Sequence, residues 1–119
     1  VIPPWRTDTA TAYAALRGRR DPQPVAPFID ALRRGDRNAI ACESYNRFEE
    51  VAGALEPRHD VLREGLEHCG ALCARLSGSG SALWCLLPDE TGTDGLQAAL
   101  APMAARSVRV LGNGREETN

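Results

Sequence analysis

The sequence contains no lysine, because all 14 basic residues are arginine. The chain therefore cannot supply a phosphate-loop lysine, a Schiff-base lysine or any other catalytic lysine. Aromatic residues make up only 5% of the chain, and no dense basic face interleaved with aromatics, the pattern typical of nucleic-acid-binding proteins, is present. The longest apolar run covers only residues 82–87, far too short to cross a membrane. We therefore expect neither a nucleic acid nor a membrane as a partner.

The length of 119 residues corresponds to a single domain with a sizeable core. The chain starts with Val1 rather than Met, and Ile2 runs directly into Pro3 and Pro4, which is typical of a strand end taken from something longer. We expect a fragment, with a folded domain at residues 1–111 and a polar tail at residues 112–119. The opening residues lack the pattern of a secretory signal, so we expect a cytoplasmic protein.

The four cysteines are not spaced like a disulfide framework or a zinc site. His68, Cys69 and Cys73 lie close together in the sequence, but no second pair at ligand spacing accompanies them. We expect no metal site and interpret the thiols as small buried apolar side chains.

The most informative stretch is Ser77-Gly78-Ser79-Gly80-Ser81, which we call the Ser/Gly loop (residues 77–81). The apolar run at residues 82–87 follows it and is typical of a strand buried on both faces. Glycines in such a loop adopt positive φ readily, and successive free N–H groups can form an anion-binding nest. A plain hairpin turn without a ligand is the alternative reading of this stretch alone.

Capping residues and apolar spacing predict several helices before the loop. Asp8 or Thr9 can cap a first helix at residues 9–16. Three arginines at residues 17, 19 and 20 complement the partial negative charge at its C-terminal end. The spacing of four apolar residues predicts a second helix that ends at Gly35: Val25, Phe28, Ile29 and Leu32. Asp36 can start a third helix that contains Ile40.

Asn46 and Glu49 resemble a capping box, in which the two side chains satisfy backbone groups at a helix start. We interpret them in that way, with a helix following to residue 55. Pro57 and Asp60 suit the first turn of another helix, which Gly70 ends. Its expected buried stripe consists of four residues: Val61, Leu62, Leu66 and Cys69.

Two strands at residues 72–77 and 82–87 are expected on either side of the Ser/Gly loop. A last amphipathic helix follows around Leu96 and Leu100, and a short strand is expected at residues 107–111. This order predicts an α+β fold, with helices packed on one face of a small, mostly antiparallel sheet.

Three separated stretches resemble motifs of one kinase superfamily. Residues 74–84 (Ala-Arg-Leu-Ser-Gly-Ser-Gly-Ser-Ala-Leu-Trp) resemble the third conserved motif of the galactokinase, homoserine kinase, mevalonate kinase and phosphomevalonate kinase superfamily. Residues 9–16 (Thr-Ala-Thr-Ala-Tyr-Ala-Ala-Leu), after Pro4, are similar to the Ser-Thr-Ala-x-Ala-Tyr segment of its 4-diphosphocytidyl-2-C-methyl-D-erythritol kinase family. Residues 46–49 (Asn-Arg-Phe-Glu) resemble that family's Asn-Asp-Phe/Leu-Glu. Their order and spacing agree with the family over roughly residues 1–111.

The resemblance implies the C-terminal half of a kinase that transfers the γ-phosphate of ATP to the tertiary hydroxyl of 4-diphosphocytidyl-2-C-methyl-D-erythritol, in non-mevalonate isoprenoid biosynthesis. In this family the long Gly-rich phosphate loop and the Asp and Lys near the reacting hydroxyl belong to the N-terminal half. ATP and Mg²⁺ are therefore expected for the full-length enzyme only. The chain alone is expected to bind neither, to contain no catalytic residue and to be inactive. Its expected partners are the cytidine diphosphate substrate and the missing N-terminal ATP-binding domain.

The substrate-binding residues that the resemblance implies are Tyr13, Thr9, Gly78, Ser79, Gly80 and Ser81. Tyr13 matches the aromatic residue that stacks on the cytosine ring, although a core aromatic on its helix is the alternative. Thr9 lies one turn earlier and either places its hydroxyl in the same cleft or caps the helix. The Ser/Gly loop is expected to pack against the missing phosphate loop and the substrate.

Four positions depart from the family pattern: Asp8 replaces Ser, Arg47 replaces Asp, Ala82 replaces Thr and Trp84 replaces Phe. The alternatives are therefore a superfamily kinase acting on homoserine or a mevalonate derivative, a stand-alone small-molecule-binding module, and an interaction domain whose Ser/Gly loop is only a turn.

Overall fold

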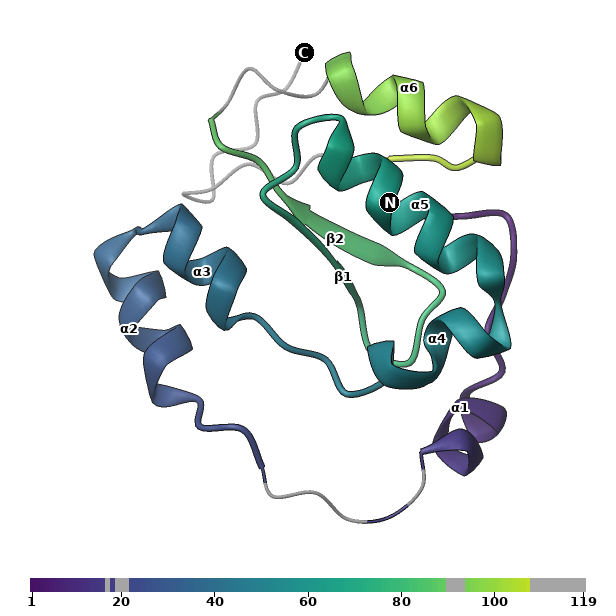
Figure 1. Ribbon diagram of the computed structural model, residues 1–119, viewed down its shortest axis with the longest axis horizontal. Helices are drawn as coiled ribbons and strands as arrows, with labels where there is room; N and C mark the ends of the chain where they lie inside the picture. The colour runs from purple at the N-terminus through teal and green to yellow at the C-terminus, as the bar shows by residue number, and fades with distance from the viewer. Residues whose placement is uncertain (17, 19–21, 90–93, 108–119) are drawn as a thin grey trace, which may run out of the picture.

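The computed structural model describes residues 1–16, 18, 22–89 and 94–107 (Figure 1). Five helices precede a two-stranded hairpin in this part of the chain, and short helical segments follow it. The helices before the hairpin are α1 (Thr9–Ala15), α2 (Ala26–Arg34), α3 (Arg37–Glu43), α4 (Glu49–Leu55) and α5 (Pro57–His68). The strands are β1 (Cys73–Leu76) and β2 (Leu83–Leu86). The segments after them are η1 (Asp94–Leu96), α6 (Gln97–Leu100) and η2 (Ala101–Met103). The predicted α+β class is confirmed.

Local side-chain chemistry sets the helix boundaries. Asp8 caps α1, because its Oδ2 accepts a hydrogen bond of 2.8 Å from the N–H of Thr11. The hydroxyl of Thr11 also donates to this carboxylate, and the two bonds lower the pKa of Asp8. Asp36 caps α3 in the same way, through a 3.0 Å bond from the N–H of Ala39. Gly35 ends α2 with φ at +63°, a conformation that glycine adopts without a steric penalty. These predicted boundaries are confirmed.

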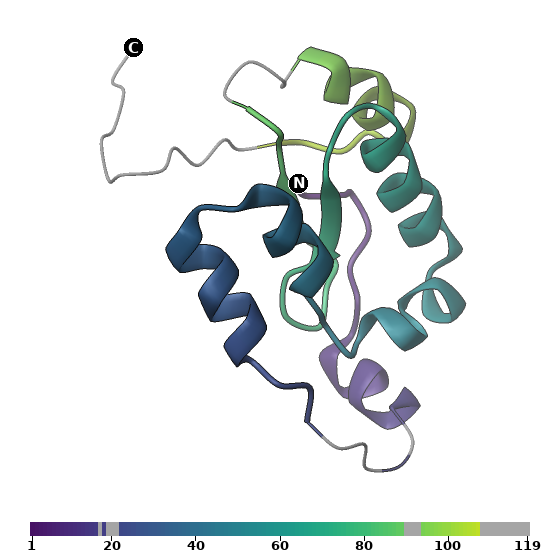
Figure 2. The same ribbon diagram turned by 60° about the vertical axis from the view of Figure 1, so that its left-hand side comes forward.

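The hairpin pairs β1 and β2 antiparallel, with Cys73 opposite Leu86 and Leu76 opposite Leu83. The two predicted strands are therefore confirmed, each slightly shorter than expected. Figures 1 and 2 show α5 and α6 on one side of the hairpin and the α2–α3 pair on the other.

The core lies between the hairpin, α5 and α6. Its buried members come from the N-terminal segment, α5, the hairpin and the segments after it: Trp5, Leu62, Leu66, Ala71, Ala74, Leu83, Leu96 and Leu100. The next residue along β2, Trp84, remains 36% exposed. The expectation of a strand buried on both faces is thus wrong, because β2 is covered over Leu83 and left open at Trp84.

The N-terminal residues extend the edge of β2. Val1 and Leu83 exchange two backbone hydrogen bonds, of 2.7 and 2.9 Å. Ile2 and Arg106 do the same at 2.7 and 2.9 Å, as an isolated antiparallel bridge. The expected strand at residues 107–111 lies outside the described residues from residue 108 onward, as do the polar tail at 112–119 and the arginines at 17, 19 and 20.

Two apolar helix faces lie differently from their sequence patterns. The apolar face of α2 is largely exposed at Val25, Ile29 and Leu32, because α2 packs on α3 and buries only Ala31. On α5, Leu62 and Leu66 are buried as predicted, whereas Val61 is 56% exposed and its predicted burial is wrong. Neighbouring helices, rather than periodicity, therefore decide which apolar residues enter the core.

None of the helices in the described residues has the length and hydropathy needed to cross a bilayer. Over the same residues, no three His, Cys, Asp or Glu side chains form a group that could hold a metal ion. All four cysteines are free thiols; Cys73 is buried as expected, but Cys42 is exposed.

Candidate functional site

The Ser/Gly loop joins β1 to β2 in a tight turn. The N–H of Ser77 donates to the carbonyl of Ala82 at 2.9 Å, and that of Gly80 donates to the carbonyl of Ser77 at 3.2 Å. Gly78 and Gly80 have φ values of +59° and +99°, which disfavour any residue with a side chain. A Cβ at Gly80 would lie 3.2 Å from the hydroxyl oxygen of Thr7, whereas one at Gly78 would meet no atom within 4 Å. The loop is thus packed on one side and open at Gly78.

Helix α1 and the segment before it contact this loop directly. The hydroxyl oxygens of Thr9 and Ser79 lie 3.0 Å apart. The hydroxyl of Ser81 donates a 2.7 Å hydrogen bond to the backbone carbonyl of Trp5. Two separated stretches of the sequence, both selected by their resemblance to one superfamily, therefore meet in space.

Tyr13 lies one turn after Thr9 on α1, and its side chain is 63% exposed. Its ring meets that of Phe48 edge to face, with centroids 4.9 Å apart and planes at 89°. The alternative of a core aromatic is therefore wrong. An exposed aromatic ring with one fixed neighbour leaves room for a planar ligand.

Asn46 and Glu49 contact the end of β1, and Asn46 also contacts the loop, so the two side chains do not form a capping box. The Asn46 side-chain amide donates to the carbonyls of Leu76 and Gly78, at 2.9 and 2.8 Å. The Glu49 carboxylate accepts the N–H of Leu76 at 2.8 Å. The α4 N-cap residue is Phe48, which makes no side-chain cap, and Asn46 Oδ1 accepts only the N–H of Phe48. The capping interpretation is therefore right only for Asn46, whose Oδ1 accepts the N–H of Phe48 at the helix start, and wrong for Glu49, which accepts the N–H of Leu76 instead.

The physical reason lies at the outer edge of β1. Hydrogen-bonded and non-hydrogen-bonded pairs alternate along an antiparallel hairpin, and Ser77 bonds to Ala82. The polar backbone groups of the next pair, Leu76 and Leu83, therefore point away from each other, those of Leu83 to Val1 and those of Leu76 to the opposite edge. A partly buried N–H without a partner costs free energy, and the Glu49 carboxylate satisfies it. An amide and a carboxylate three residues apart look the same in sequence whether they cap a helix or hold a neighbouring loop.

Arg47, where the resembled family has Asp, donates a 2.5 Å hydrogen bond from Nη2 to the carbonyl of Gly18. It thereby links Gly18 to the turn that precedes α4. This departure from the family pattern has a structural role outside the loop.

The chemistry of the cluster favours binding over catalysis. It presents hydroxyls from Thr9 and Ser79, an open glycine and an exposed tyrosine ring, while the Glu49 carboxylate is occupied by a backbone N–H. Within the described residues, no set of His, Cys, Asp and Glu side chains is arranged to hold a metal here.

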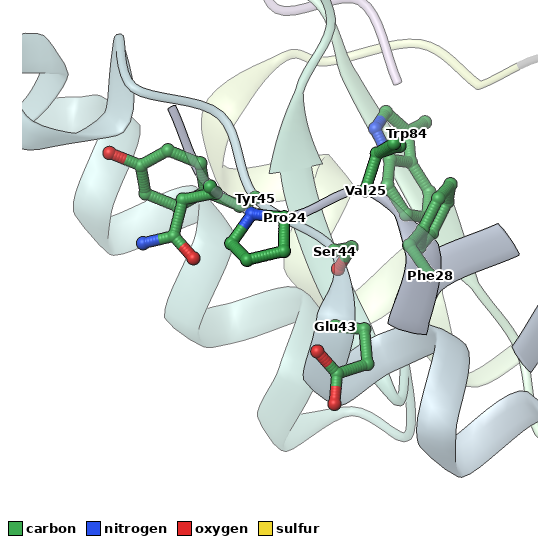
Figure 3. A pocket seen from close by; sticks show the side chains of 8 residues that line it. Pro24, Val25, Phe28, Glu43, Ser44, Tyr45 and Trp84 are labelled. Carbon is green, nitrogen blue, oxygen red and sulfur yellow. The ribbon is translucent and has the colours of Figure 1, made fainter. Parts of the chain in front are cut away.

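A separate cavity of about 440 Å³ lies between the start of α2, the end of α3 and β2 (Figure 3). Its lining residues are Gln23, Pro24, Val25, Phe28, Glu43, Ser44, Tyr45 and Trp84. The lining contains a carboxylate and no cationic side chain, which does not suit a phosphate group. None of the residues expected at the substrate site lines it.

Comparison with known proteins identifies a family and several relatives. Residues 28–104 match the family described as GHMP kinases C terminal. The chain is 38% identical over 96 residues to the 4-diphosphocytidyl-2-C-methyl-D-erythritol kinase of Streptomyces avermitilis, over 78% of this chain and 32% of that protein. Identity to the kinase of that name from Porphyromonas gingivalis is 36% over 99 residues, 79% of this chain and 33% of that protein.

A third relative of the same name, from Nitratidesulfovibrio vulgaris, is 32% identical over 111 residues, 91% of this chain and 38% of that protein. The chain thus spans about a third of the length of the curated relatives it matches. No solved structure shows a significant match to the chain. The family match runs from within α2 to beyond η2 and includes the hairpin with its Ser/Gly loop, so the chain belongs to the GHMP kinase C-terminal family.

Proposed function

We propose that this chain is the substrate-side, C-terminal domain of a cytoplasmic kinase that phosphorylates the tertiary hydroxyl of 4-diphosphocytidyl-2-C-methyl-D-erythritol, a step of non-mevalonate isoprenoid biosynthesis. The observation that carries the proposal is the position of Tyr13. Its exposed ring stands one helical turn from Thr9, whose hydroxyl contacts the Ser/Gly loop. The names of the relatives support the same substrate.

In this proposal Tyr13 stacks on the cytosine ring, and the loop contacts the remainder of the substrate. A base that stacks on an aromatic side chain gains about 1–3 kcal/mol, whatever the base. The edge contact with Phe48 restrains the Tyr13 ring, which reduces the entropy lost when the base binds. Gly78, with no atom within 4 Å of an added Cβ, leaves the loop backbone open to close approach by the substrate.

We infer that ATP and Mg²⁺ bind to another part of the longer protein. The sequence has no lysine, and the described residues contain no group of three acidic, His or Cys side chains suited to a cation. We therefore assign ATP, Mg²⁺ and the phosphoryl-transfer residues to an N-terminal domain of the longer protein. The role left to this chain is to bind and orient the substrate, and alone it would be inactive.

The test is a phosphorylation assay of the longer protein that contains this domain. With ATP present, we expect turnover of 4-diphosphocytidyl-2-C-methyl-D-erythritol and none of homoserine or mevalonate. Homoserine or a mevalonate derivative as the preferred substrate would support another kinase of the superfamily, which the departures at Asp8 and Arg47 leave open. Binding of a small molecule without any ATP-dependent transfer would favour a stand-alone binding module.

Two variants of Tyr13 test the stacking. Tyr13→Ala should weaken the binding of cytidine nucleotides to the longer protein by about 1–3 kcal/mol, which is roughly 5- to 150-fold in Kd. Tyr13→Phe keeps the ring and should bind within about twofold of the parent. Equal affinities of the alanine variant and the parent would remove Tyr13 from the site.

A further inference from the structure

We propose that Asn46 and Glu49 are positioning residues, which hold the Ser/Gly loop at the correct distance from Tyr13 for one ligand to contact both. The inference rests on the proposed function and extends it to residues that themselves do not face the substrate. It applies to a ligand with a base at one end and a polar group at the other, because only such a ligand needs both parts of the site at once.

Three hydrogen bonds carry the argument: two end on Leu76, the residue before the loop, and one ends on Gly78 within it. Leu76 is the last residue of β1, and both its carbonyl and its N–H are bound, the former by Asn46 and the latter by Glu49. Asn46 also binds the carbonyl of Gly78, the residue with the open Cβ direction. The loop's departure from β1 and its open point are therefore fixed by the same amide.

Residues 46–49, which contact the Ser/Gly loop, also contact the ring of Tyr13. Phe48 lies between Asn46 and Glu49 in the sequence, and its ring meets the ring of Tyr13 at 4.9 Å. Residues 46–49 thus contact the end of β1 and the loop through two side chains and the stacking ring through a third. A shift of this turn would change the separation of Tyr13 from Gly78, even with both residues intact.

The alternative is that the two residues only stabilise the hairpin. Glu67 offers a matched control, because its carboxylate accepts the N–H of Ala74 at 3.2 Å. Glu49 and Glu67 therefore both bind a backbone N–H of β1, but only Glu49 does so where the loop begins. Asn38, exposed on α3, offers a second control for the charge added by an Asn→Asp change.

Asn46→Asp is the first test variant. It keeps the oxygen that accepts the N–H of Phe48 and replaces the donor NH₂ by an oxygen facing two carbonyls. In the longer protein we expect its KM for the complete substrate to rise about tenfold, the effect of losing a hydrogen bond of ordinary strength. The Kd for a cytidine nucleotide, which needs only Tyr13, should stay within about twofold. Asn38→Asp should change neither value.

The Glu49 variants separate positioning from stability. Glu49→Ala should raise KM about tenfold, while Glu49→Gln, which keeps an acceptor oxygen for Leu76, should recover most of the loss. Glu67→Ala should lower the thermal midpoint as Glu49→Ala does and leave KM unchanged. If KM rises equally in Glu49→Ala and Glu67→Ala, the effect is general destabilisation and the positioning role is overturned.

Hydrogen exchange of the loop amides measures how firmly the loop is held, without any substrate. Asn46→Asp should accelerate exchange at residues 77–81, and Glu67→Ala should not. Unchanged exchange in Asn46→Asp overturns the inference whatever the substrate proves to be. Accelerated exchange, in a protein that does not phosphorylate the cytidine substrate, supports the holding role and rejects the proposed function alone.

Discussion

The hydroxyl oxygens of Thr9 and Ser79 lie 3.0 Å apart, although 70 residues separate them in the chain. This contact joins the first residue of α1 to the middle of the Ser/Gly loop. It places the predicted base-stacking helix and the predicted substrate loop on one surface. Both stretches resemble motifs of one superfamily, and a site shared by them requires that they meet in space.

A double-mutant cycle of Thr9→Val and Ser79→Ala measures this contact. Because both side chains lose only a hydroxyl donor or acceptor, we expect a coupling of about 0.5–1.5 kcal/mol, at the lower end since the bond is exposed. The measurement is denaturant unfolding of the parent, the two single variants and the double variant. Thr9→Ser, which keeps the hydroxyl, should retain the coupling; strictly additive losses would show that the two hydroxyls do not interact.

Truncation of Leu66 and of Val61, on the same helix, should change the free energy of unfolding to very different extents. Leu66 is fully buried, so Leu66→Ala should destabilise the protein by about 2–5 kcal/mol through lost burial and a cavity. Val61 is 56% exposed, and Val61→Ala should change the free energy of unfolding by less than about 0.5 kcal/mol. Urea unfolding of both variants checks this; a loss at Val61 as large as that at Leu66 would contradict the described packing of α5.

Local signals were enough to predict much of the fold. Asp8 and Asp36 mark helix starts because a carboxylate at an N-cap acts on N–H groups only a few residues away. Gly35 marks a helix end for an equally local reason, its positive φ. The two strands and their turn are also local, since the Ser/Gly loop is flanked by apolar runs.

The remaining features depend on which element packs on which. The face of α2 with Val25 and Leu32 has the spacing of a buried stripe, yet α2 packs on α3 and buries only Ala31, which lies off that face. The pattern of Asn46 and Glu49 predicts a capping box because the sequence does not reveal that the outward backbone groups of Leu76, 27 to 30 residues further on, need partners. The roles expected for Tyr13 and the Ser/Gly loop residues in binding substrate stay predictions.

His59 should make the stability of the protein fall as the pH falls. The ring is 3% exposed, its Nε2 has no hydrogen-bond partner in the described structure, and burial lowers its pKa despite the nearby charges of Asp60 and Glu49. The unfolded chain therefore binds a proton near the ordinary pKa of 6.5, before the folded protein does. Protonation thus favours unfolding below about pH 6.5 and has no effect well above it.

The measurement is the thermal midpoint of the parent and of His59→Leu between pH 8 and pH 5. The parent should lose more stability over this range than the variant, because only the parent contains His59, whose pKa is lowered by burial. Parallel curves for the parent and His59→Leu would contradict a neutral, buried imidazole.

Cys42 and Cys85 should differ in their reaction with a thiol reagent. Cys42 is exposed on α3, whereas Cys85 is half-buried in β2 and desolvation raises its pKa to about 11. Only the thiolate reacts, and a pKa of about 11 leaves roughly one Cys85 thiol in a thousand ionised at pH 8. Restricted access and the low ionised fraction therefore both slow the reaction of Cys85 with the reagent.

Labelling the native protein with Ellman's reagent at pH 8 should show a fast phase that Cys42→Ser abolishes. Cys85→Ser should leave that phase unchanged, since Cys85 contributes only to the slow reaction. Denaturation should expose all four thiols and remove the difference in rate, because each cysteine then has the access and pKa of an unfolded chain. A fast phase that persists in Cys42→Ser and disappears in Cys85→Ser would contradict the burial of β2 against α5 and α6.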